Sequence, residues 1–505
     1  MPIDKPRFPI GRRHFLGAAF AGLGSVIVGC GRDAGSGVAV DTPSATPRVL
    51  PEGLPLRTLG ALVNESADES QFSATLVAAP AVATALPGPS TPMLLYNTVG
   101  PGPLIELREG QHVRITLDNQ LDHDSTIHWH GLPVPPDQDG NPMDPVHAGA
   151  SRLYEYDIPP GTAGTYWYHP HPDAATAEQV ARGLAGPLIV RAPDDPLAHI
   201  PEVTMFITGL RLDQNARIAA DDAIDWSVGR QREKLLVNGD RLPVHAVRPG
   251  STERWRIFNA TAARHFRLAL EGHTLTLVGT DGGLLGAPIA GLPEIVLAPA
   301  QRIEILATLN ASPNGRYRLR ALSYETDFLG LGTYVDDDLL TVVTTNELPA
   351  APIDVPTSLR PIADLGPAAV RQLVDLDEVH GLCTRTGATV AFLINGRTFD
   401  PTRVDLTMVA GRVELWDIVN HTAMAHPFHI HGTQFQLVSR QLGTVVTPAP
   451  YLAWIDTILV PSQQTATIKT RQALPGKRMF HCHILEHEDN CMMAILEVRP
   501  SANLV

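Results

Sequence analysis

Residues 481–493, near the C-terminus, place a cysteine between two histidines and add a third histidine and a methionine downstream. Cys482, His487 and Met492 are the sulfur and nitrogen donors of a blue-copper site, which needs a second histidine from elsewhere in the chain. Neighbouring residues of a strand point to opposite faces, so His481 and His483 can serve a second metal centre while Cys482 serves the first. The segment therefore predicts two linked metal centres.

Three upstream segments each carry two histidines separated by one residue, and His426 supplies the missing blue-copper donor. These pairs are His128 with His130, His169 with His171, and His429 with His431. A single pair of this kind is usually an ordinary pair of strand residues. Four pairs beside a cysteine, histidine and methionine set indicate metal sites. Eight imidazoles exceed what a tetrahedral zinc site uses, and zinc gives the sulfur donors no redox role, so copper is the predicted metal.

The stretches HWHG at 128–131, HPFHIHG at 426–432 and HCHILEHED at 481–489 resemble those of bacterial multicopper oxidases. This laccase-like family includes copper-efflux oxidases and spore-coat laccases, and the resemblance covers the chain from about residue 50 onward. It implies four copper ions. The type 1 copper would take His426, Cys482 and His487, with Met492 axial; the type 2 copper would take His128 and His429; and the type 3 pair would take His130, His169, His171, His431, His481 and His483.

The resemblance also implies a mechanism. The type 1 copper takes single electrons from a reducing substrate, Cys482 passes them to its neighbouring histidines, and the three-copper cluster reduces dioxygen to water. Relatives have an acid beside the last type 1 histidine that acts as a proton donor, and another acid near the type 2 copper. Glu488 and Asp139 occupy those places. A structural salt bridge for Glu488 and an ordinary turn for Asp139 are the alternatives.

The elements that must position these residues repeat three times along the chain. Each repeat runs from a turn glycine through an alternating strand to an asparagine: 110–119, 250–259 and 411–420. Asn-Gly pairs at 238–239 and 395–396 indicate tight turns between strands. High proline and glycine contents with few aromatic residues suit a loop-rich β protein. We therefore predict an all-β chain of three tandem Greek-key β-sandwich domains, which the resemblance identifies as cupredoxin domains.

The predicted domains cover residues 52–195, 196–346 and 347–505. His265 holds the place in the middle repeat that His426 holds in the third, but no further histidine pair follows it. The middle domain is thus predicted to be a spacer without copper, with His265 a structural residue. The three-copper cluster must then lie between the first and third domains. Copper loss should loosen that interface as well as abolish activity.

The N-terminus predicts export. Arg12 and Arg13 precede a short apolar run, so residues 1–30 are expected to be a twin-arginine signal peptide ending in a lipobox at Cys30. Residues 31–51 should be a flexible linker. The protein would be periplasmic or attached to the cell envelope by a lipid anchor on Cys30, with a soluble periplasmic form as the alternative. Export would permit a disulfide between Cys383 and Cys491, but for Cys491 we favour a buried apolar role.

The reductant is the least constrained part of the prediction. A formal charge of −14 argues against nucleic acid as a partner, and a monomer is expected. Nine methionines, with no cluster at 310–410, argue against a dedicated cuprous oxidase. We expect oxidation of phenols or aromatic amines, and oxidation of Cu(I), Mn(II) or Fe(II) is the alternative. Asp456 could accept a proton from such a substrate at the type 1 edge, or could instead form a hydrogen bond at the end of a strand. The full ligand set disfavours both a copper-free structural or cell-division protein and a copper-storage or electron-transfer module.

Overall fold

The computed structural model describes residues 50–83, 90–326, 335–381, 386 and 388–501. The twin-arginine segment, Cys30 and Cys383 lie outside the described residues. The described residues all belong to one compact unit. Strands dominate it, so the all-β prediction is confirmed. Among the described residues, no helix has the length and apolar character needed to cross a membrane.

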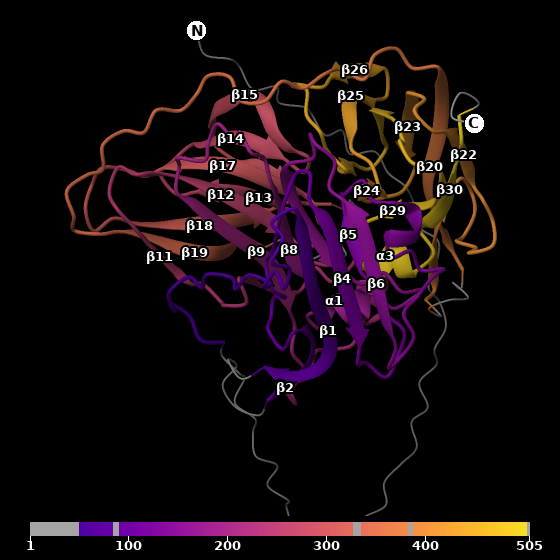
Figure 1. The fold of residues 1–505 in the computed structure, drawn as a ribbon, viewed down its shortest axis with the longest axis horizontal. Coiled ribbons are helices and arrows are strands. Elements are labelled where there is room, and N and C mark those ends of the chain that lie inside the picture. Colours follow the sequence, from indigo (N-terminus) through magenta and orange to yellow (C-terminus); the bar gives the residue numbers. More distant parts are fainter. Residues whose placement is uncertain (1–49, 84–89, 327–334, 382–385, 387, 502–505) are drawn as a thin grey trace, which may run out of the picture. The chain divides into compact units, whose positions relative to one another are not determined.

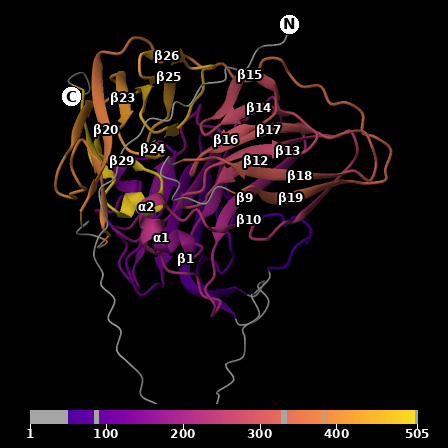
Figure 2. The same cartoon turned by 180° about the vertical axis from the view of Figure 1, so that it is seen from behind.

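The strands form six sheets, two in each third of the chain, and can be followed by colour in Figure 1 and from behind in Figure 2. The sheets of the first sandwich are β2 (Thr91–Tyr96), β1 (Gln71–Ala83), β4 (His112–Asn119) and β6 (Ser151–Asp157), and then β3 (Ile105–Arg108), β8 (Gly186–Arg191), β7 (Gly164–His169) and β5 (His128–His130).

The middle sandwich pairs a sheet of six strands with one of five. The first sheet is β10 (Lys234–Val237), β9 (Glu202–Leu210), β12 (Thr252–Asn259), β17 (Arg302–Thr308), β14 (Leu275–Thr280) and β15 (Gly283–Leu292). The second is β11 (Val244–Val247), β19 (Asp337–Thr344), β18 (Arg316–Ser323), β13 (Phe266–Leu270) and β16 (Ile295–Leu297).

The third sandwich repeats this arrangement. Its first sheet is β21 (Val390–Ile394), β20 (Val370–His380), β23 (Glu414–Asn420), β28 (Gln464–Thr470), β25 (Phe435–Leu442) and β26 (Val445–Pro448). Its second is β22 (Leu406–Val409), β30 (Met493–Arg499), β29 (Gly476–Cys482), β24 (His426–Ile430) and β27 (Thr457–Val460).

Strand pairing is the same in all three sandwiches. The first long strand of each runs antiparallel to the next strand and parallel to the strand of the sequence repeat, as β1, β9 and β20 do with β4, β12 and β23. β5, β13 and β24 are equivalent strands, and so are β7, β18 and β29. The threefold repeat read from the sequence is therefore confirmed, whereas the predicted boundaries at 195 and 346 remain a prediction.

The asparagine that ends each repeat fixes the loop leading to these equivalent strands. Asn119, Asn259 and Asn420 are buried. The Asn420 side-chain amide donates to the carbonyl oxygens of Met424 and Val460, at 2.7 and 2.9 Å. The amides of the other two asparagines donate to loop carbonyls in the same way. Each asparagine thus satisfies backbone groups that the sheets leave unpaired, and the one in the third sandwich fixes the approach to His426.

Short helices fill the gaps between sheets: η1 (Pro136–Gln138), α1 (Thr176–Ala181), α2 (Ala223–Val228) and α3 (Leu485–Asp489). Helix α3 follows β29 and contacts both α1 of the first sandwich and α2 of the middle one. Leu485 packs in an apolar cluster with Ala177 and Ala262, which come from the other two sandwiches. The segment that carries His487 is therefore held by all three parts of the chain.

Candidate metal centre

A cysteine and two histidines meet in the core of the third sandwich. His426 begins β24, Cys482 ends β29, and His487 lies on α3. The Cys482 Sγ atom lies 3.3 Å from His426 Nδ1 and 3.9 Å from His487 Nδ1, and the two Nδ1 atoms are 3.4 Å apart. All three side chains are fully buried. Their donor atoms converge on one point, as ligands of one metal ion do.

The outer nitrogen of each of these imidazoles has its own partner. His426 Nε2 lies 2.7 Å from the Thr422 hydroxyl, and His487 Nε2 lies 3.2 Å from the backbone oxygen of Ser227 in α2. Such bonds fix the ring orientation and leave the inner nitrogen free for a metal. The Cys482 amide donates to the Met492 carbonyl at 3.1 Å, which places the buried Met492 in the same group of residues.

Eight histidines from the first and third sandwiches meet at a second place. His128 pairs with His169 across β5 and β7, and His429 pairs with His481 across β24 and β29. The eight fall into groups whose ligand atoms lie within 4.8 Å of one another. These groups are His171, His431 and His481; His130, His169 and His483; and His128, His130 and His429. The six histidines that the resemblance assigned to the type 3 pair therefore divide into two sets of three.

The nitrogen atoms of these groups fit metal ions and lack other partners. His481 Nε2 lies 3.3 Å from His171 Nε2 and 3.1 Å from His431 Nε2. Several buried nitrogens have no hydrogen-bond partner among the described residues: Nε2 of His128, His169 and His429, Nδ1 of His130, and both ring nitrogens of His483. Unpaired buried acceptors are costly in a folded protein, and bound metal ions would satisfy them.

Backbone carbonyls select the nitrogen that each ring presents. Nδ1 of His128 lies 3.0 Å from the Asp139 carbonyl oxygen, and Nδ1 of His429 lies 2.8 Å from that of Asp456. Nδ1 of His169 and of His481 also bond carbonyl oxygens, at 2.9 Å. A nitrogen that donates to a carbonyl leaves the opposite one as a lone-pair acceptor, which is the form that binds a metal.

Burial keeps these imidazoles neutral. It lowers the pKa of His426 and His481 to about 3, and with repulsion among neighbouring rings it lowers the pKa of others far below the usual range. A neutral imidazole keeps its lone pair for a metal. Burial also raises the pKa of the Cys482 thiol, so the thiolate needs a cation beside it, and a coordinated metal deprotonates such a thiol.

Two predicted acids lie beside the histidines. The Asp139 carboxylate is 3.2 Å from Nδ1 of both His128 and His431. The Glu488 carboxylate is 3.4 Å from His171 Nε2 and 3.2 Å from His481 Nδ1. Burial, and then the nearby Asp489, raise the pKa of Glu488 far above its usual range. Both acids thus contact cluster histidines, and their catalytic roles stay predictions.

Of the two roles considered for Asp456, proton acceptance at the type 1 edge is wrong and hydrogen bonding is what the structure shows. Its carboxylate is fully buried and lies 3.0 Å from His130 Nε2, in the eight-histidine cluster. Arg302 and Gln434 occupy its remaining acceptor positions, so it is not available to a substrate at the cysteine site. The sequence could not reveal this, because Arg302 and Asp456 are far apart in the chain and meet only through the packing of two sandwiches.

The glycine after each of two histidine pairs makes room for an arginine. A Cβ atom on Gly131, at φ +90°, would lie 2.2 Å from Asp456 Oδ2 and 2.9 Å from Arg302 Nη2. A Cβ atom on Gly432, at φ +66°, would lie 1.9 Å from Arg478 Nη1. Both glycines therefore combine a left-handed backbone with close approach of a buried side chain, which explains the final G of HWHG and HPFHIHG.

Known proteins share these features. Multicopper oxidase family models match residues 79–195, 166–334 and 372–502. Over 417 residues the chain is 32% identical to a multicopper oxidase of Staphylococcus aureus, with 80% of this chain and 83% of that protein covered. The chain belongs to the multicopper oxidases. It is also 27% identical over 481 residues to a laccase of Bacillus subtilis, with 81% of this chain and 91% of that protein covered.

Solved multicopper oxidase structures share the fold. The structure of one from Campylobacter jejuni, described as a metallo-oxidase, aligns with a TM-score of 0.83 and 38% identity, covering 89% of this chain and 96% of that one. A laccase-like multicopper oxidase from Ochrobactrum aligns with a TM-score of 0.77 and 28% identity, covering 88% and 100%. The three sandwiches are therefore cupredoxin domains, and the protein is a copper-dependent oxidoreductase with oxygen as acceptor.

The middle cupredoxin domain contributes no donor to any candidate metal group among the described residues. His265 is buried, and its Nδ1 lies 3.0 Å from the Ala263 carbonyl oxygen, as expected of a structural histidine. The favoured interpretation of Cys491 was wrong in one respect: the residue is buried but disulfide-bonded, with its partner outside the described residues.

Sequence reasoning missed the residues that hold the multicopper oxidase's histidines from other domains. Ser227 and Arg302, both in the middle domain, contact His487 and Asp456 respectively. No local pattern marks them. For Thr422, a signal did exist, since it lies two residues after the repeat asparagine, Asn420.

Proposed function

We propose that this multicopper oxidase binds four copper ions, with the ligands that the family resemblance assigned. The observation that carries the proposal is the convergence of imidazole and thiol donor atoms at two buried places. One is the Cys482 group, and the other is the set of eight histidines, in which two triads suit a type 3 pair and His128 with His429 suit a type 2 ion. Bound copper would supply one-electron redox chemistry and the reduction of dioxygen to water.

Strand β29 links the two places. Cys482 is flanked by His481 and His483, and His481 Nδ1 bonds the Cys482 carbonyl oxygen at 2.9 Å. The two centres are thus connected both through covalent bonds and through a hydrogen bond, which supports electron transfer between them. Full burial of the cluster histidines excludes bulk water, and Glu488 and Asp139 can hold protons beside them.

We propose a small metal ion, Cu(I), Fe(II) or Mn(II), as the favoured reductant. The His487 ring, which is the expected entry point for electrons, exposes none of its surface. Its outer nitrogen bonds Ser227 of α2, and Phe392 stacks on its face at 3.8 Å. A phenol cannot stack on a ring enclosed in this way. The formal charge of −14 attracts cations, and the Campylobacter jejuni relative, a metallo-oxidase, supports the same class.

Phenols and aromatic amines are the second candidate class. The Ochrobactrum relative is described as having oxidase activity towards lignin model compounds, and the Bacillus subtilis relative is a laccase. Electrons could reach His487 from such a substrate bound on the outer surface of α2, through the Ser227 carbonyl. This path is longer than direct contact of a substrate with the His487 ring, so slower turnover of phenols is expected.

Copper content and the visible spectrum test the proposal first. Purified copper-loaded protein should bind about four copper ions per chain and show an intense blue thiolate band. Cys482→Ser should remove the blue band and the activity while keeping the copper of the histidine cluster. Oxygen uptake should then be higher with Fe(II), Cu(I) or Mn(II) than with 2,6-dimethoxyphenol. Colourless loaded wild-type protein would overturn the copper assignment; faster phenol turnover would overturn only the choice of reductant.

For localisation, we propose export by the twin-arginine route and attachment to the cell envelope through a lipid on Cys30. We also propose that the oxidase acts as a monomer and that its three domains have the predicted boundaries. The support is the sequence pattern at residues 12–30. Cys30→Ser should release the protein from membranes into the soluble periplasmic fraction. Unchanged membrane association would contradict the lipid anchor.

A further inference from the structure

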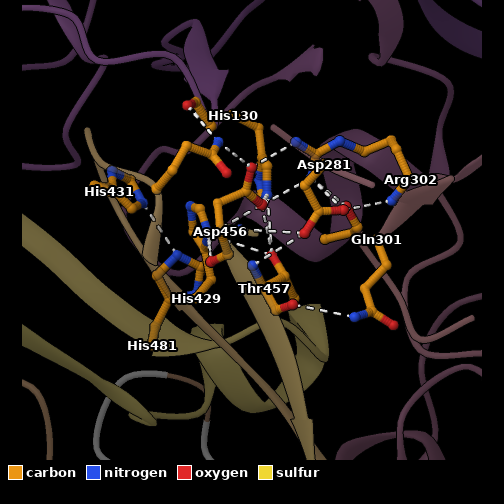
Figure 3. A network of polar contacts seen from close by, with 12 residues as sticks. His130, Asp281, Gln301, Arg302, His429, His431, Asp456, Thr457 and His481 are labelled. Carbon is orange, nitrogen blue, oxygen red and sulfur yellow. Dashed lines mark hydrogen bonds and ion pairs between the residues drawn. The ribbon is translucent and has the colours of Figure 1, made fainter. Parts of the chain in front are cut away.

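We propose that Arg302, in the domain that supplies no copper ligand, is a positioning residue for the three-copper cluster and acts through Asp456. The inference rests on the proposed function, because it takes His130 and His429 as copper ligands. It changes the role of the middle domain from a spacer to a part of the cluster's support. Figure 3 shows Arg302, Asp456 and Asp281 beside these histidines.

Arg302 joins all three domains. It begins β17 of the middle domain and is fully buried. Its Nε donates to the Thr165 carbonyl oxygen of β7, in the first domain, at 2.8 Å. Nη1 and Nη2 donate to the two carboxylate oxygens of Asp456, in the third domain, at 2.7 and 2.5 Å. The guanidinium fork thus fixes both the position and the orientation of the Asp456 carboxylate.

Asp456 in turn orients two histidines. Its Oδ1 atom lies 3.0 Å from His130 Nε2, and its carbonyl oxygen lies 2.8 Å from His429 Nδ1. The opposite nitrogens, His130 Nδ1 and His429 Nε2, are buried and have no partner. The His130 and His429 rings stack, with their centroids 3.8 Å apart. Asp456 therefore helps to set which nitrogen each ring turns toward the proposed three-copper cluster, in which His429 is a type 2 ligand and His130 a type 3 ligand.

Asp281 holds this pair from the middle domain. It lies in the turn between β14 and β15. One carboxylate oxygen accepts from the Arg302 amide at 2.8 Å, and the other accepts from the Asp456 amide at 3.2 Å. Arg302 and Asp456 are thus fixed through the backbone as well as through their side chains, and the anchor again lies outside the domains that carry the ligands.

The chemistry of the pair makes the arginine specific. Asp456 has no exposed surface, and a buried carboxylate is costly unless a cation and hydrogen bonds compensate it. Lysine would keep the charge but could not make the two parallel bonds that set the carboxylate plane. Arg302→Lys should therefore leave the domain folded while letting Asp456 rotate away from His130.

A nearby arginine supplies a matched control. Arg254 is also buried in the middle domain and binds two carboxylates, those of Glu304 and Asp195, at 2.5 and 2.6 Å. Glu304 in turn bonds Thr165 of the first domain at 2.8 Å. Arg254 thus contributes to the same domain interface but touches neither Asp456 nor a histidine. Arg254→Lys reports the effect of a weakened interface alone.

The experiment compares wild type, Arg302→Lys and Arg254→Lys as full-length, copper-titrated proteins. The readouts are copper per chain, the type 2 signal in electron paramagnetic resonance, the blue band, and urea unfolding of the metal-free forms. Changes to residues that orient ligands typically cost about 10- to 100-fold in metal affinity. Arg302→Lys should need at least about tenfold more copper to develop the type 2 signal, with its blue band unchanged. Arg254→Lys should match wild type in both signals.

The possible results distinguish failure of the positioning role from failure of the proposed function. A type 2 titration of Arg302→Lys equal to wild type, or an equal loss in Arg254→Lys, would overturn the positioning role. If the wild type itself gives no type 2 signal, the proposed function fails instead. If Arg302→Lys does not fold, the variant Asp281→Asn replaces it in the experiment. Asparagine has the shape of aspartate but should form weaker hydrogen bonds with the amides of Arg302 and Asp456. An altered type 2 hyperfine splitting in that variant is expected, and an unchanged one would overturn the inference.

Discussion

Glu488 has surroundings unlike those of an ordinary carboxylate. Its carboxylate is buried and lies within 3.4 Å of His171 and His481. We expect Glu488→Gln to keep the blue band and the copper content while slowing oxygen reduction by about 100-fold or more, because glutamine has the same shape but does not transfer a proton. Stopped-flow mixing of the reduced protein with oxygen measures this step.

The adjacent Asp489 is the control for that change. Its carboxylate accepts from the amides of Thr176 and Ala177 at 3.2 and 2.9 Å and so anchors α1. Asp489→Asn should lower stability without a matching loss in the oxygen step. Reoxidation of Glu488→Gln at the wild-type rate would leave only a structural role for that acid.

His265 predicts a dependence of stability on pH. Burial lowers its pKa to about 3, against an ordinary value of 6.5. Between these values the unfolded chain binds a proton at this residue and the folded chain does not, so folding stability falls as the pH falls. One such proton contributes about 1.4 kcal/mol per pH unit. The test is urea unfolding of the metal-free protein between about pH 6 and pH 4. The free energy of unfolding of His265→Asn should fall with decreasing pH less steeply than that of wild type, by about 1.4 kcal/mol per pH unit. Parallel curves of stability against pH for the variant and wild type would contradict this role of His265.

At the scale of elements, the ligand-bearing segments could be predicted because they are local. The alternation of β29 separates Cys482 from its flanking histidines in the sequence itself, and the repeat asparagines mark the strands that precede each site. The partners of these segments could not be predicted. The contact of Asp456 with His130 and that of Ser227 with His487 join residues far apart in the chain, and only domain packing determines them.

The turn after β5 gives a prediction at this scale. Gly131→Ala places a Cβ atom against Asp456 and Arg302 and also strains a backbone at φ +90°. Gly396→Ala isolates the strain, because Gly396 has φ +71° and no atom within 4 Å of the added Cβ. The control should cost about 1–2 kcal/mol in the free energy of unfolding, with copper binding unchanged. Gly131→Ala should cost more and lose type 2 copper. Equal effects in the two variants, measured by urea unfolding and metal analysis, would contradict the packing argument.

For the whole molecule, the three-domain order was predictable because each domain repeats the same pattern. The role of the middle domain was not, because its contribution consists of single residues without a motif. Arg302 and Ser227 each contact a group from another domain. A chain of three similar domains thus carries its proposed copper ligands in two of them and part of their support in the other.

Copper removal should therefore weaken the whole assembly as well as stop catalysis. The histidines of β5 and β7 face those of β24 and β29, so metal ions bound between them join the first and third domains. Without metal, their unpaired buried nitrogens favour separation. We expect the thermal unfolding midpoint to fall by on the order of 10 °C on chelation, and hydrogen exchange to rise in β5 and β24 but not in β13 of the middle domain. Cys482→Ser, which should lose only the type 1 ion, should keep most of the wild-type midpoint. Identical midpoints and exchange with and without copper would mean that protein contacts alone hold these domains together.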